Sequence, residues 1–146
     1  MTRWHSFLRS FGDLLFDRRC AACGTSLDPA LTDAPAAHRV FCPLCADALA
    51  PMEGCRCTRC ADLFASARRN HVCGDCLRHP PPFDTVLCDL QYGGPLAQAI
   101  ARFKYGPRPT LAAPLSTLLS IQPVSVDVAV PVPLSRSRLI SRGFNQ

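Results

Sequence analysis

The sequence has little lysine and little net charge. Lys104 is the only lysine among 16 basic residues, and 11 acidic residues leave a formal net charge of +5. This excess is divided between the two halves of the chain and forms no basic tail, so it permits contact with phosphate or nucleic acid but does not predict it. Long apolar runs are missing too, since none approaches the roughly 18 residues that a spanning helix needs. We therefore expect no transmembrane segment.

The sequence also lacks a secretory signal. Charged residues interrupt the first 19 positions and leave no continuous apolar stretch of the kind that a signal peptide contains. We therefore expect a cytoplasmic protein, in which thiols stay reduced. This expectation favours metal binding over disulfide formation as the role of the cysteines in this chain.

Cysteine, by contrast, is abundant: the chain has 10, and only Cys88 lies beyond residue 82. A small segment this rich in cysteine depends on disulfides or metal, because it buries little apolar surface. Eight of the ten form four Cys-x-x-Cys pairs: Cys20 and Cys23, Cys42 and Cys45, Cys57 and Cys60, Cys73 and Cys76. Two such pairs across a short loop are typical of a tetrahedral four-thiolate zinc site. The sequence therefore predicts two structural zinc ions in an approximate internal repeat.

Some details of these sites stay open. Either Cys55 or Cys57 could serve the second site, and Cys57 is preferred because it has the two-residue spacing with Cys60. His71 could replace a ligand there, whereas Cys88 is expected to be a small buried residue. A redox pair or an iron–sulfur cluster fits the two-plus-two grouping less well than zinc. The other histidines, His5, His38 and His79, are expected at the surface.

Two kinds of residue are expected to support the metal sites. Glycine next to the pairs, at Gly24 and Gly74, frees the backbone to direct N–H groups at the sulfurs. Arginines can offset the excess negative charge that four thiolates leave on Zn²⁺, and the candidates are Arg18, Arg19, Arg56 and Arg59.

The rest of the chain shows patterns of regular structure. Residues 1–17 predict an amphipathic helix, packed on the protein, with a membrane surface or a partner as alternatives. A stiff linker is expected at Pro80–Pro82. Strands are predicted at 84–92 and 124–132, and helices from Pro95 to Gly106, from Thr110 to Leu119 and after Ser135. Such an order of strand, helix, helix and strand opens an α/β domain.

The residues beyond 82 resemble a known family. Six elements stand in the order found in ComF-type proteins: Phe83, Tyr92 to Leu96, Ile100, Phe103 to Gly106, Val130 to Leu134, and Arg142 to Gln146. That family resembles type I phosphoribosyltransferases and is linked to DNA uptake in competent bacteria. The resemblance implies a double zinc ribbon at 18–79, followed by an incomplete α/β phosphoribosyltransferase-like domain at 83–146.

The same resemblance implies a site for phosphoribosyl pyrophosphate (PRPP). Its pyrophosphate is expected at the loop after the second predicted strand, formed by Pro133, Leu134, Ser135 and Arg136. Backbone N–H groups at such a turn, with Arg136 or Arg138, suit an anion, although both arginines could instead be solvated helix residues. Other family positions have no assigned role: Lys104, Tyr105, Arg142, Gly143, Asn145 and Gln146. Mg²⁺ is expected to accompany PRPP in a full-length relative, and no catalytic residue is identified.

The sequence departs from the family in one respect. Beyond residue 82 the acidic residues are Asp84, Asp89 and Asp127, and no Thr-Thr-Gly loop follows any of them. In the family, paired aspartates before such a loop bind the ribose and its phosphate. We therefore expect an N-terminal piece of a ComF-type protein that binds PRPP weakly and transfers nothing. The alternative is a double zinc ribbon that binds single-stranded DNA or a competence-machinery protein, although aromatic residues for base stacking are sparse.

Overall fold

The computed structural model describes residues 18–28, 34–65, 68–106, 108–119 and 126–146. The chain divides into two compact units. One comprises Met1–Leu49, Tyr92–Leu119 and Ser125–Gln146, and the other Ala50–Gln91 and Ser120–Val124. The amphipathic helix predicted for residues 1–17 lies outside the described residues, and Pro80–Pro82 lies within the second unit.

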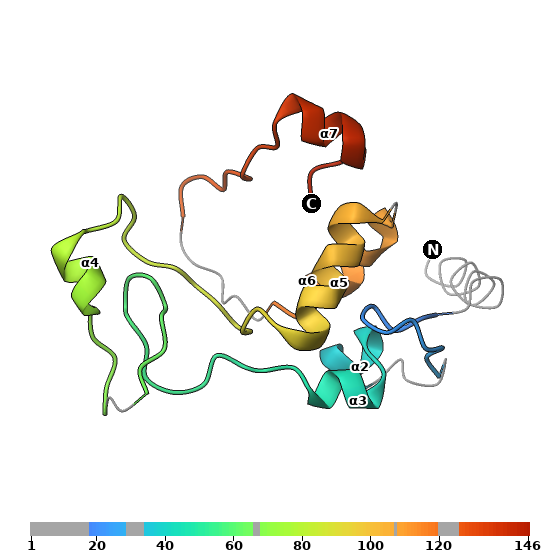
Figure 1. The fold of residues 1–146 in the computed structure, drawn as a ribbon, viewed down its shortest axis with the longest axis horizontal. Helices are drawn as coiled ribbons and strands as arrows, with labels where there is room; N and C mark the ends of the chain where they lie inside the picture. Colours follow the sequence, from blue (N-terminus) through green and yellow to red (C-terminus); the bar gives the residue numbers. More distant parts are fainter. Residues whose placement is uncertain (1–17, 29–33, 66–67, 107, 120–125) are drawn as a thin grey trace. The chain divides into compact units, whose positions relative to one another are not determined.

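The regular structure of the described segments consists mostly of short helices, which are separated by turns and loops (Figure 1). They are α2 (Ala36–Val40), α3 (Pro43–Asp47), α4 (Gly74–Arg78), α5 (Gly94–Tyr105), the 3₁₀ helix η2 (Pro109–Leu111), α6 (Ala112–Ser116) and α7 (Arg136–Arg142). None of these helices has the length and apolarity needed to cross a bilayer.

No β-strand forms in the described ranges, where only isolated bridges join backbone segments. The strand predicted for 84–92 is wrong, because Leu90 makes a single bridge to Pro51 there. Over its described part, 126–132, the second predicted strand is also irregular, and its valines are exposed. A strand needs a neighbouring strand for its hydrogen bonds, and the described residues provide none. The α/β domain therefore stays a prediction.

The helix predicted from Pro95 is confirmed as α5. Proline fits its first turn, where the missing N–H would have no partner, and the Gly106 N–H closes the far end on the Arg102 carbonyl at 2.9 Å. The next helix is shorter than predicted, because Thr110 lies inside η2 and does not cap α6. Pro114 falls in the first turn of α6, where proline is tolerated.

A single apolar cluster joins the first two cysteine pairs to the later helices of the same unit. Phe41 and Ala99, the latter on α5, are both 0% exposed, and Cys20 and Cys42 belong to the same cluster. Partly buried leucines after α5 pack against it: Leu111, Leu115 and Leu118. The first cysteine site thus shares its core with α5.

Candidate metal centres and the hollow at α7

The structure brings eight cysteines together in two groups, and in each group the sulfur atoms lie within 4.8 Å of one another. The groups are Cys20, Cys23, Cys42 and Cys45, and Cys57, Cys60, Cys73 and Cys76. Two sulfur pairs, Cys23 with Cys42 and Cys60 with Cys73, are 3.7 Å apart. Four sulfurs about 2.3 Å from a tetrahedral ion are about 3.8 Å apart, so this spacing fits zinc. All ten cysteines are free thiols.

The first pair of each group lies on the same kind of turn. Equivalent hydrogen bonds close both turns. In the first turn, Cys20 N–H donates to the Thr25 carbonyl and Gly24 N–H donates to the Cys20 carbonyl. In the second turn, Cys57 N–H donates to the Asp62 carbonyl and Ala61 N–H donates to the Cys57 carbonyl. Gly24 has φ +83°, a left-handed conformation in which glycine avoids the steric cost of a side chain.

The second pair of each group starts a short helix. Cys42 precedes α3 and Cys73 precedes α4, so each pair spans a first helical turn. The Cys73 sulfur accepts a hydrogen bond from the Cys76 N–H at 3.4 Å. The internal repeat is therefore confirmed. Gly74 opens α4 without a positive φ, so the expectation of special backbone freedom at that glycine is wrong.

The thiols of each group differ in acidity. The Thr25 hydroxyl, 3.2 Å from the Cys23 sulfur, lowers the pKa of Cys23 to about 6. Burial alone raises the pKa of Cys57, but backbone N–H groups, from Cys73 first, outweigh it and lower the pKa to about 6.

Burial, with crowding by neighbouring sulfurs, raises the pKa of Cys45 and of Cys76 to about 12. Four adjacent thiols cannot all ionise without a cation among them. Thiolate ligands select zinc and other thiophilic metals rather than Mg²⁺ or Ca²⁺. The two groups are thus compatible with two structural zinc ions and have no open position for chemistry.

The residues left open by the sequence lie outside these groups. Cys55 is not a member, and its carbonyl accepts the Phe64 N–H at 2.9 Å. His71 is not a member either, and its ring stacks on Phe64. The prediction of a buried Cys88 is wrong, because this residue is half-buried and its carbonyl accepts the Arg56 guanidinium at 3.2 Å.

The surrounding arginines and histidines have varied roles. Arg18 donates to the Arg39 carbonyl at 3.1 Å, so it links the backbone segments that precede the first and second cysteine pairs. His38 is half-buried, not a surface residue as predicted, and its Nε2 lies 3.7 Å from the Asp47 carboxylate. His79 is exposed, as predicted, and His5 lies outside the described residues.

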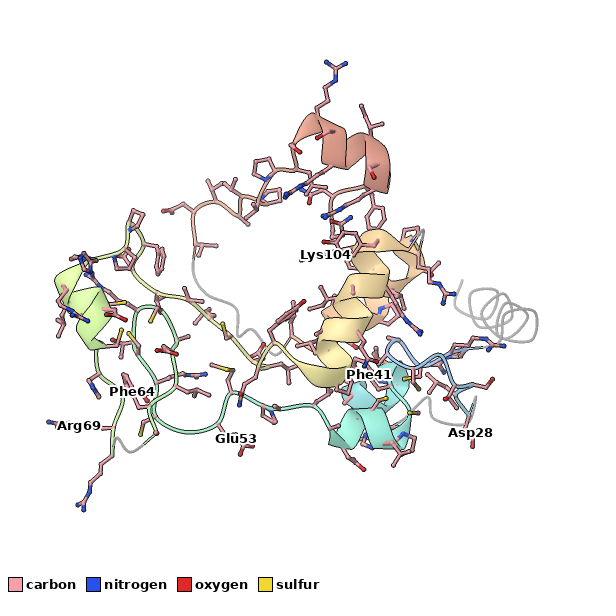
Figure 2. The ribbon with its side chains drawn as sticks, viewed as in Figure 1. Asp28, Phe41, Glu53, Phe64, Arg69 and Lys104 are labelled. Atoms are coloured by element: carbon pink, nitrogen blue, oxygen red, sulfur yellow. The ribbon has the colours of Figure 1, made fainter. Side chains whose placement is uncertain are left out.

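Two motifs that carry the ComF resemblance meet at the end of α5. Phe103 and Phe144 have ring centroids 5.3 Å apart, and the Arg142 guanidinium lies 5.2 Å from the Tyr105 ring centre. A hollow of about 550 Å³ opens beside them. Its lining includes Lys104, Tyr105, Ser137, Arg138, Ser141 and Arg142 (Figure 2 labels Lys104).

The loop predicted to hold pyrophosphate does not line this hollow. Ser135 precedes α7 as predicted, but its hydroxyl makes no capping hydrogen bond, and Arg136 is exposed. Pro133 and Leu134 do not line it either. Farther on, Asn145 donates to the Val132 carbonyl at 2.9 Å.

Sequence reasoning missed the serines of the hollow. Ser137 and Ser141 are four residues apart, as are Arg138 and Arg142, and this spacing places each pair on one helical face. The remaining family positions are Gly143, which ends α7 in the left-handed conformation, and Gln146, which accepts from Arg142 at 3.0 Å.

Comparison with protein families agrees with the cysteine geometry. Residues 11–77 match the family model of the double zinc ribbon domain. This segment is a double zinc ribbon. The two ribbons are built around the first and the second group of four cysteines.

The chain is also homologous to proteins named DNA utilization protein YhgH. Identity is 31% with the protein of Escherichia coli K12, 30% with that of Shigella flexneri and 32% with that of Salmonella typhimurium, each over 119 residues. Each match covers 75% of this chain and 51% of the relative. The chain therefore spans about half the length of these relatives. No solved structure matches the chain.

Proposed function

We propose that this is a ComF-type protein of DNA utilization, and that the hollow at α7 takes the pyrophosphate of PRPP. The name of the homologous proteins supports the link to DNA. The observation that carries the PRPP assignment is the lining of the hollow, where Lys104, Arg138 and Arg142 bring three cationic side chains together.

The chemistry of the hollow suits a polyanion. No acidic residue lines it, and the hydroxyls of Ser137 and Ser141 add hydrogen-bond donors beside the cations. Arginine forms forked hydrogen bonds with phosphate oxygens, and a lysine adds a compact charge. Mg²⁺ would accompany the pyrophosphate and offset part of its negative charge. The proposal places the protein in the cytoplasm, where its thiols stay reduced.

Calorimetric titration with inorganic pyrophosphate tests the assignment. We expect millimolar binding that weakens about tenfold in Arg138→Ala, because arginine–phosphate contacts are charge-assisted. Arg78→Ala is the matched control, since Arg78 is an exposed arginine of α4 in the other unit. Equal binding by Arg138→Ala and the wild type would overturn the proposed site.

We also propose a second function, in which the double zinc ribbon binds single-stranded DNA. The homology to proteins named for DNA utilization favours DNA over a protein of the uptake machinery as the partner. The test is fluorescence anisotropy of a labelled oligothymidine with the zinc-loaded chain at two salt concentrations. Binding that weakens with salt is expected, and no binding at the lower salt concentration would overturn this second function.

A further inference from the structure

A stacked aromatic pair lies at the surface of the second ribbon. The rings of Phe64 and His71 have centroids 4.2 Å apart and planes inclined by 15°. Phe64 is half-buried and His71 is exposed. The His71 ring therefore stacks on Phe64 and is still exposed to solvent.

The first ribbon has the same two backbone positions but uses them differently. In the first ribbon, Leu27 N–H donates to the Arg18 carbonyl and Ala21 N–H donates to the Val40 carbonyl. In the second ribbon, Phe64 N–H donates to the Cys55 carbonyl and Thr58 N–H donates to the His71 carbonyl. Leu27 thus corresponds to Phe64, and Val40 corresponds to His71. Leu27 and Val40 are 7% and 3% exposed and belong to the apolar core. The positions that the first ribbon uses for its apolar core therefore carry aromatic rings in the second ribbon, with Phe64 half-buried and His71 exposed.

The exposed ring is held in place by its neighbours. His71 Nδ1 lies 3.1 Å from the Arg69 carbonyl, and the His71 carbonyl accepts the Thr58 N–H at 3.1 Å. The adjacent Asn70 side chain accepts the Arg56 N–H at 2.9 Å. A ring fixed in this way presents a preformed flat surface, which loses little conformational freedom when a ligand stacks on it.

Two arginines lie close to His71 in the sequence. Arg68 and Arg69 are both exposed, and Arg69 projects away from the ribbon in Figure 2. Neither takes part in the ion pairs found among the described residues, which involve Arg78 and His38. Two guanidinium groups are thus within two or three residues of an exposed ring.

We propose that Phe64, Arg68, Arg69 and His71 form a tip that binds single-stranded nucleic acid. One base stacks on the outer face of the His71 ring, and the two arginines contact the neighbouring phosphates. A duplex fits less well, because its paired bases stack on each other and do not expose their faces. This inference rests on the second proposed function and names the surface that performs it.

The test uses the full zinc-loaded chain, labelled oligothymidine as the probe, and a duplex of the same length for comparison. We expect His71→Ala to weaken single-strand binding about tenfold, while His71→Phe, which keeps a ring, retains it. In the double variant Arg68→Ala/Arg69→Ala, we expect the slope of log affinity against log salt concentration to become shallower by about one to two. Arg78→Ala is the control for charge, and zinc content is measured for each variant.

The outcomes separate the two proposals. If the wild type binds no single strand, both the second proposed function and the tip are overturned. If it binds but all the tip variants match Arg78→Ala with zinc retained, only the tip is overturned. Equal affinity for duplex and single strand would overturn the stacking arrangement.

Discussion

In the second ribbon, Ala61 has the left-handed backbone conformation that Gly24 has in the first ribbon. The φ angles are +63° and +83°, and Ala61 is the one non-glycine with a positive φ among the described residues. Both residues follow a Cys-x-x-Cys pair and donate their N–H to the carbonyl of the first cysteine. A side chain in this conformation costs roughly 1–2 kcal/mol. The second turn therefore carries strain that the first avoids.

Substitution of Gly24 and of Gly74 by alanine should have different effects on the free energy of unfolding. Gly24→Ala should destabilise the fold by about 1–2 kcal/mol through backbone strain. The added Cβ would also meet the Arg102 Nη1 at 3.2 Å. Gly74→Ala, in a helix with open space around it, should be neutral or stabilising by a few tenths of a kcal/mol. Thermal unfolding of the zinc-loaded variants measures both, and equal losses would contradict this account.

Purified, reduced protein should contain two zinc ions per chain. Cys57→Ser should remove about one equivalent, because its sulfur belongs to the second group, whereas Cys55→Ser should remove none. Metal analysis of protein shown to be folded measures both. One zinc or fewer in the wild type would disprove the two-site assignment, and equal losses from the two variants would mean that the ligand choice is wrong.

Loss of the first zinc should loosen α5, whereas loss of the second should not. Cys42 shares an apolar cluster with Ala99 of α5, and Cys76 lies in the other compact unit. Amide hydrogen exchange on Cys42→Ser should therefore show faster exchange across α5 than on Cys76→Ser. Similar protection of α5 in the two variants would mean that the first site does not support the helix.

Zinc affinity should rise with pH. At pH 7 in zinc-free protein, Cys45 and Cys76 are protonated because burial raises the pKa of each to about 12, so zinc must displace their protons. The pKa of Cys23 and of Cys57 is lowered to about 6, so the stability that each thiolate contributes is present at high pH and lost as pH falls through about 6.

Calorimetry in buffers of different ionisation enthalpy measures this proton release. At least one proton per zinc is expected at pH 7, and zinc retention should fall sharply in acid. Cys88→Ser should leave the release unchanged, since Cys88 is in neither group. Binding without proton release would show that the thiols are ionised before zinc arrives.

The features that the sequence predicted well are local ones. A Cys-x-x-Cys turn needs only its own few residues, so spacing was enough to indicate both groups and to prefer Cys57 over Cys55. The ends of α5 were predictable for the same reason, because Pro95 and Gly106 act within one helical turn.

The features that failed depend on distant partners. Residues 126–132 have strand-forming valines, but no described neighbour pairs with them. The hollow was missed because it requires α7 to meet the end of α5, which is a tertiary contact: Phe103 packs near Phe144, and Arg142 lies over the Tyr105 ring. The family resemblance placed the pyrophosphate instead at the loop that contains Ser135 and Arg136, which do not line the hollow.

Inorganic pyrophosphate and PRPP should bind the 146-residue chain with similar, millimolar affinity. The hollow offers Lys104, Arg138 and Arg142 to the pyrophosphate, but the sequence has no paired aspartates or Thr-Thr-Gly loop for the ribose and its phosphate. Competitive calorimetry compares the two ligands: micromolar binding of PRPP alone would show that the chain contacts the ribose through residues this account has not identified.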